Sequence, residues 1–129
     1  MGKTVVAVRE GLFADNQLLG ARCGACERHH FPRSSRCPYC GSDSVRETTL
    51  SGHGTLWAWT AVTAAPPGYR GPVPFGFGVV ELPEGVRVIT RLTEADPAKL
   101  TFGMAVHLVT DELHTDDDGA TVVTYAFSP

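Results

Sequence analysis

The stretch CGACERHHFPRSSRCPYCG, residues 23–41, contains all four cysteines of a 129-residue chain. They form two Cys-x-x-Cys pairs, Cys23 with Cys26 and Cys37 with Cys40. Each pair makes one tight turn, and the segment between the pairs lets the two turns face each other. Structural zinc is held by four such thiolates in a tetrahedron. Gly41 follows the second pair, where a glycine accepts positive φ and leaves its amide free to approach a thiolate. The spacing therefore predicts a structural zinc ribbon with these four cysteines as ligands.

Other uses of the four cysteines fit the pattern less well. Disulfides need an oxidising compartment, and a thioredoxin-like redox site would use a single pair at the start of a helix. A catalytic zinc leaves one position open to water, whereas four cysteines close the coordination shell. A nucleophilic cysteine partnered by His29 or His30 would have to be free of metal, and both histidines are expected on the surface of the ribbon loop. Iron fits four sulfurs as well; zinc is the expected metal because nothing indicates an electron-transfer partner.

Beyond residue 47 the sequence is typical of short strands separated by turns. A proline-rich loop is expected over 64–74, a tight turn at Pro-Glu-Gly 83–85, and a short helical turn in DPAKL, residues 96–100. The strands are expected over 55–63, 75–82, 86–92, 104–113 and 121–127. Three strands, a helical turn and two further strands are the element order of an OB-fold, a five-stranded Greek-key barrel. The glycines of the second strand permit coiling of the strand or the close approach of another backbone.

The first twenty residues carry a different pattern. Leu12, Phe13, Leu18 and Leu19 recur at roughly helical spacing, which predicts one or two short helices. The expected protein is thus mainly β, with a helical segment over 1–20, a zinc ribbon over 21–46 and a five-stranded barrel over 47–129.

The net charge of −3 is unevenly distributed. Residues 22–46 carry five arginines and two acidic side chains, a net charge of +3, whereas residues 47–129 carry −6. Four thiolates and one Zn²⁺ would lower the ribbon to about +1. Proteins that bind single-stranded nucleic acid need a basic track with stacking aromatic residues. Trp57 and Trp59 are expected to share one face of their strand, where core packing is the commoner role. A nucleic-acid binder is therefore the alternative rather than the leading hypothesis.

The chain has neither the features of a signal peptide near residue 1 nor an apolar run long enough for a membrane span. We therefore expect a soluble, cytoplasmic protein, in a compartment where thiols stay reduced.

The assembled segments resemble the DUF35 family, whose members combine an N-terminal helical segment, a rubredoxin-like zinc ribbon and an OB-fold. The resemblance is carried by LLGARCGACERHHFPRSSRCPYCGS (18–42), SGHGTLWAWTAV (51–62), ELPEGVRVITRL (81–92) and LTFGMAVHLV (100–109). The cysteine spacing is shared by many ribbons, and the order of all four segments is far more specific.

This resemblance implies a non-catalytic accessory subunit of acyl-CoA metabolism. Family members accompany thiolases, thiolase-like aldolases or acyl-CoA hydratases, and contact of the barrel with acyl-CoA has been proposed for them. No nucleophile–base pair or open metal site stands out in the sequence, which agrees with chemistry that belongs to a partner. Aromatic and arginine side chains are favoured at interface centres, so Tyr69, Arg70, Arg28 and Arg33 are expected to contact the partner or acyl-CoA.

Overall fold

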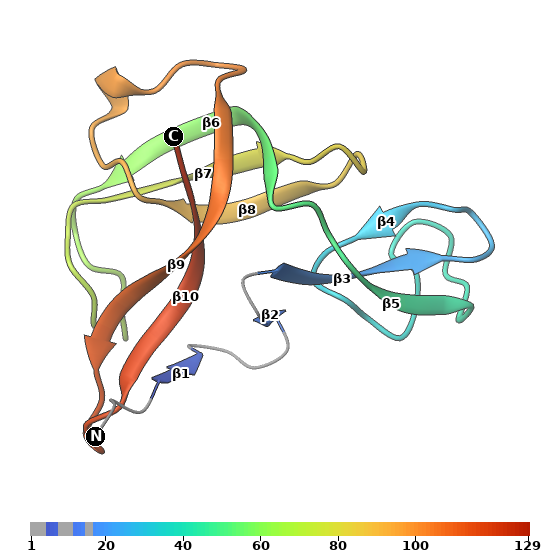
Figure 1. Ribbon diagram of the computed structural model, residues 1–129, viewed down its shortest axis with the longest axis horizontal. Coiled ribbons are helices and arrows are strands. Elements are labelled where there is room, and N and C mark those ends of the chain that lie inside the picture. Colours follow the sequence, from blue (N-terminus) through green and yellow to red (C-terminus); the bar gives the residue numbers. More distant parts are fainter. Residues whose placement is uncertain (1–4, 8–11, 15–16) are drawn as a thin grey trace.

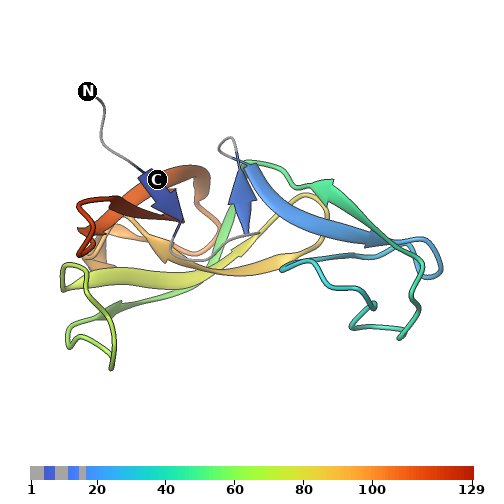
Figure 2. The same cartoon turned by 90° about the horizontal axis from the view of Figure 1, so that it is seen from below.

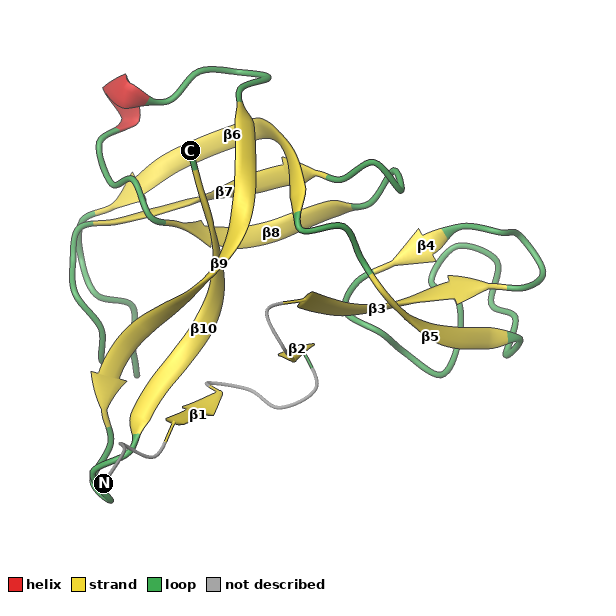
Figure 3. Ribbon diagram, in the orientation of Figure 1, coloured by secondary structure: helices red, strands yellow, loops and turns green. Residues whose placement is uncertain are grey.

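The computed structural model describes residues 5–7, 12–14 and 17–129 of the chain. Two β units lie side by side: a barrel formed by the C-terminal strands, and a smaller sheet with long loops formed by residues before 50 (Figure 1). Strands and loops make up nearly all of the described chain, as Figure 3 shows. The single helix in the described part of the chain is the three-residue 3₁₀ turn η1 (Pro97–Lys99). No described helix has the length and apolarity that a bilayer crossing requires.

The barrel is a closed ring of five strands. Antiparallel pairing joins β6 to β7, β7 to β8, β6 to β9 and β9 to β10, and a short parallel pairing of β8 with β10 closes the ring. The strands are β6 (His53–Val62), β7 (Phe75–Glu81), β8 (Arg87–Leu92), β9 (Ala105–Thr115) and β10 (Thr121–Ser128). With η1 between the third and fourth strands, this is the predicted OB-fold. A further strand, β1 (Val5–Ala7), pairs in parallel with β10.

Glycines allow the barrel strands to approach each other closely. A Cβ on Gly78 would collide with the carbonyl oxygen of Ala58 on β6, and one on Gly76 would collide with that of Glu94. Gly85 adopts φ of 83° in the turn of the β7–β8 hairpin, a conformation that favours glycine. The close backbone approach and the hairpin predicted from the sequence are both confirmed.

A β-bulge in β6 separates the two tryptophans. The register with β7 shifts between Leu56 and Ala58, so the inside–outside alternation breaks there. Leu56 is buried, Trp57 is 43% exposed, and Trp59 packs against the core and donates its indole N–H to the carbonyl oxygen of Pro97. The expectation that Trp57 and Trp59 share one face is therefore wrong, because the extra residue of the bulge changes the order of the faces.

The smaller sheet forms around β3 (Gln17–Cys23), which pairs antiparallel with β2 (Phe13–Ala14), β4 (His29–His30) and β5 (Val45–Thr49). Short helices were expected over residues 1–20. Where the structure describes this segment, that prediction is wrong, and the rest of it lies outside the described residues. Short apolar runs fit a helix or a strand equally well. This segment forms a strand instead of a helix because β3 pairs with β5, which is remote in sequence. The boundary expected between residues 20 and 21 falls inside β3.

The two units share a hydrophobic core. Leu18 of β3 has no exposed surface, and it belongs to the same buried cluster as Leu50 and the barrel residues Val80, Val88 and Phe127. Seen from below, β3 runs from the barrel out into the ribbon (Figure 2). Because the strand that leads to the first cysteine also fills the barrel core, the ribbon is anchored by packing as well as by the chain connection.

Candidate metal centre

Two tight turns with the same hydrogen-bond pattern present the four cysteines. Glu27 donates its amide to the carbonyl oxygen of Cys23 at 2.9 Å, and Gly41 donates its amide to that of Cys37 at 2.9 Å. Both donors have positive φ, 65° at Glu27 and 77° at Gly41. The positive φ predicted for Gly41 is confirmed, but its amide bonds the carbonyl oxygen of Cys37 instead of a thiolate. In the first turn a glutamate occupies the same left-handed conformation, which is costly for residues with a side chain.

The sulfur atoms gather at one point. All four lie within 4.8 Å of one another, with 3.6 Å between Cys23 and Cys40 and 3.6 Å between Cys26 and Cys37. A disulfide needs about 2.05 Å, and all four cysteines are free. Four sulfurs at about 2.3 Å from a central ion would be about 3.8 Å apart, the edge of that tetrahedron. The arrangement therefore fits one structural zinc ion.

Amide hydrogen bonds prepare the thiols for a cation. The amide of Cys26 at 3.5 Å lowers the pKa of Cys23 to about 6, against an opposing effect of burial and with help from the amide of Ala25 at 3.4 Å. Burial raises the pKa of Cys37, but amides in its turn outweigh this effect, so its pKa is lowered. The amide of Ser42 lowers the pKa of Cys40, but the neighbouring sulfurs and burial raise it to about 11. Four thiol groups this close together cannot all ionise to thiolates unless a cation offsets the negative charge.

The two histidines of the ribbon take separate places outside this cluster. His29 is half-buried, whereas His30 is 2% exposed and lies with its Nε2 3.3 Å from the hydroxyl of Ser34. The expectation that both are surface residues is wrong for His30, because its strand packs against β3. Only the four cysteines form a metal-binding group among the described residues.

The structure does not bring the four expected contact residues together. Arg28 lies over the ring of Tyr39 on the ribbon, and Arg33 forms an ion pair with Glu47 at 2.9 Å.

Tyr69 and Arg70 lie in the 63–74 loop of the barrel instead. The Tyr69 hydroxyl accepts a hydrogen bond from Arg91 and donates one to the carbonyl oxygen of Pro72, both at 2.8 Å, so this side chain fastens the loop. Arg70 is more than half exposed, with Asp117 at 3.5 Å.

An exposed apolar strip on the barrel was missed by the sequence reasoning. It consists of Trp57, Phe77 and Ile89, which are 43%, 39% and 61% exposed on β6, β7 and β8. A groove of about 370 Å³ beside it runs between Phe77, Ile89 and the ribbon residue Phe31. The alternation in VRVITRL could have revealed the strip, because Ile89 shares its outward-facing row with Arg87 and Arg91.

Comparison with known proteins supports both the zinc ribbon and the OB-fold barrel. The family model described as the rubredoxin-like zinc ribbon domain of ChsH2 matches residues 12–46, and the one described as its C-terminal OB-fold domain matches residues 47–111. A DUF35 domain-containing scaffold protein of Pyrococcus furiosus is 37% identical over 82% of this chain and 80% of its own length. The chain belongs to the DUF35 family. Its similarity to the relatives covers ribbon and barrel together.

Two further relatives carry names that refer to enzyme subunits. The benzoylsuccinyl-CoA thiolase subunit BbsA of Thauera aromatica is 29% identical over 85% of this chain and 74% of its own length. A probable enoyl-CoA hydratase alpha subunit of Thermomonospora curvata is 33% identical over 79% of this chain but only 31% of its own length.

One solved structure shares the arrangement of ribbon and barrel. A chain of the Ltp2-ChsH2(DUF35) aldolase superposes with a TM-score of 0.66 and 31% sequence identity, covering 88% of this chain and 84% of that one. These relatives bear the names of scaffold proteins or enzyme subunits.

Proposed function

We propose that this protein is an accessory subunit that docks on an enzyme of acyl-CoA metabolism, either a thiolase-fold thiolase or aldolase or an acyl-CoA hydratase, whose own residues perform the catalysis. The observation that carries the proposal is the likeness to a chain of the Ltp2-ChsH2(DUF35) aldolase over nearly its whole length. The names of the thiolase and hydratase relatives give the same class of partner.

The apolar strip of Trp57, Phe77 and Ile89 is the proposed docking face. Large apolar patches on a protein surface commonly mark sites of interaction. Here the guanidinium of Arg87 lies 4.2 Å from the centre of the Trp57 ring. Aromatic and arginine side chains in such arrangements are common at the centres of interfaces. Tyr69, Arg70, Arg28 and Arg33 remain proposed contacts with the partner or with acyl-CoA.

The ribbon has a structural part in this proposal. Cys23, Cys26, Cys37 and Cys40 are the proposed ligands of one zinc ion, which fixes the loops of the ribbon unit (21–46) beside the barrel unit (47–129). Such a site depends on reduced thiols, which the cytoplasm maintains, so this is the proposed location.

Co-purification tests the docking proposal. The tagged chain is expressed with a thiolase-like or hydratase-like protein from the same organism, and the complex is measured by size-exclusion chromatography with light scattering. Ile89→Glu should abolish the complex, because it places a charge at the centre of the strip. Phe102→Glu is the matched control, since Phe102 is 69% exposed and lies in the loop before β9, outside the strip. A complex that survives Ile89→Glu would exclude this docking face.

A nucleic-acid binder is the alternative, and one observation favours it. OB-folds bind oligonucleotides on their second and third strands, and here these strands carry Phe77 with Arg87 and Arg91. The acidic side chains of residues 47–129 oppose it, because they repel phosphate backbones. Tight binding of single-stranded oligonucleotides with a steep salt dependence would support the alternative over the docking proposal.

A further inference from the structure

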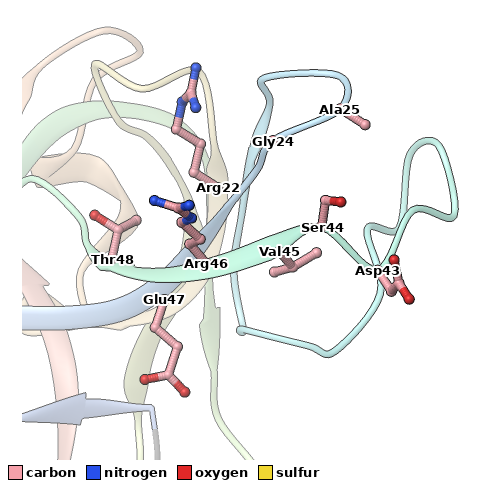
Figure 4. A pocket seen from close by; sticks show the side chains of 9 residues that line it. All are labelled: Arg22, Gly24, Ala25, Asp43, Ser44, Val45, Arg46, Glu47 and Thr48. Atoms are coloured by element: carbon pink, nitrogen blue, oxygen red, sulfur yellow. The ribbon is translucent and has the colours of Figure 1, made fainter.

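A hollow on the ribbon lies beside the first cysteine turn, whose Gly24 and Ala25 line it, and none of the residues of the apolar strip borders it. It has a volume of about 680 Å³ and forms over the paired strands β3 and β5. Arg22, Arg46, Ser44 and Thr48 extend to the same side of these strands, and Gly24 leaves space between them (Figure 4). Cys23 alternates with Arg22 along β3, so its sulfur faces the other side.

Arg22 and Arg46 are direct cross-strand partners in this hollow. Like charges at opposite positions of an antiparallel pair destabilise a sheet. Most of the ribbon's other arginines avoid this arrangement: Arg28 lies over an aromatic ring, and Arg33 pairs with Glu47. Local arrangements that oppose stability are commonest at functional sites.

Neighbouring acidic groups do not neutralise the two guanidinium groups. Arg22 has Glu27 at 3.6 Å, but both side chains are largely exposed, which makes the pair weak. Arg46 forms no ion pair within the described part of the chain. Glu47 points to the opposite side of β5, and Asp43 lies at the far end of the hollow (Figure 4). The hollow therefore contains two guanidinium groups whose positive charge and N–H donors are not fully used by the surrounding side chains.

The number of donors distinguishes between anions. One guanidinium fork already satisfies a carboxylate with two parallel hydrogen bonds. A phosphate monoester carries a charge of about −1.5 to −2 at pH 7 and three acceptor oxygens, so it needs two cationic groups and further donors. Ser44 and Thr48 border the hollow and supply hydroxyl groups. We propose that this hollow binds the phosphate monoester group of a small molecule, with Arg22 and Arg46 as its two charged donors.

The test is a titration of the full zinc-loaded chain, followed by NMR of the backbone amides. The probes are AMP as a monoester, orthophosphate, and a single-stranded oligonucleotide. AMP should shift the amides of residues 22–24 and 44–48. Arg22→Gln and Arg46→Gln should each weaken AMP binding about tenfold or more, because each removes a charge-assisted fork. Lys99→Gln, which removes a positive charge from η1, should change the affinity less than about twofold.

A second measurement separates a ligand site from a structural role. Arg46→Glu replaces the repulsion with an attractive cross-strand pair, so in phosphate-free buffer its thermal midpoint should equal or exceed that of the native chain while AMP binding is lost. Equal affinity of orthophosphate and AMP would support the site and identify free phosphate as a source of the group. Unchanged AMP affinity in Arg46→Gln, an absence of amide shifts, or binding of the oligonucleotide alone would overturn the proposal. The titration uses the isolated chain, so its failure would leave the docking proposal standing.

Discussion

Replacing Leu18 with alanine tests whether ribbon and barrel share one core. Leu18 lies on β3, the strand that leads into the first cysteine turn, yet its side chain is fully buried in the cluster that fills the barrel. Its truncation should therefore destabilise the barrel even though the residue is outside the five barrel strands.

The expected loss follows from the carbons removed. Leucine to alanine deletes about three methyl or methylene groups, each worth about 0.8 kcal/mol of transfer free energy, and the cavity left behind adds to this. The sum is about 3–4 kcal/mol, a large part of the 5–15 kcal/mol that typically stabilises a domain. With a urea dependence of about 1–3 kcal/mol per molar, the midpoint should fall by more than about 1 M.

Urea unfolding of the zinc-loaded protein measures this loss by two signals. Fluorescence of Trp57 and Trp59, which both lie on β6, reports the barrel, and zinc release to a coloured chelator reports the ribbon. The two transitions should coincide and shift together in Leu18→Ala. Leu19→Ala is the matched control, since Leu19 is only half-buried on the same strand and should cost less than about 2 kcal/mol. Zinc release well before the fluorescence change, or equal losses in the two variants, would refute the shared core.

Three further predictions concern the metal centre. Cys37→Ser should lower the zinc content of the purified protein below one ion per chain and cause misfolding. Metal analysis measures the zinc content and circular dichroism the misfolding. A full zinc content in this variant would contradict the four-sulfur site. Zinc affinity should fall as the pH is lowered, because protons compete with the ion for the four thiolates, most readily at Cys40, whose pKa is raised to about 11. A chelator titration across pH checks this, and an affinity that stays constant or rises as the pH falls would contradict it. Glu27→Gly should raise the free energy of unfolding by about 1 kcal/mol, and Gly41→Ala should lower it by a similar amount, since both positions have positive φ. A thermal melt in which Glu27→Gly is less stable than the native chain would show that the strain is absent.

Features that depend on residues close together in the sequence could be predicted from the sequence alone. The metal site follows from two Cys-x-x-Cys turns, each formed within five residues, and the left-handed glycine at Gly41 follows from the same local geometry. The order of the barrel strands was also predictable, because alternation, turn residues such as Gly85 and the proline of η1 act within a few residues of where they occur.

Features that depend on partners distant in sequence were decided only by the tertiary structure. Residues 19 and 20 became strand because β5 pairs with them, and His30 became buried because its short strand packs against β3. The bulge in β6 is a property of its register with β7, which no local pattern encodes. Arg22 and Arg46 are far apart in the chain and meet only across β3 and β5. Local chemistry fixes how each turn and strand forms, whereas the side chains that face one another are set by which strands pair, and that depends on the free energy of the whole fold.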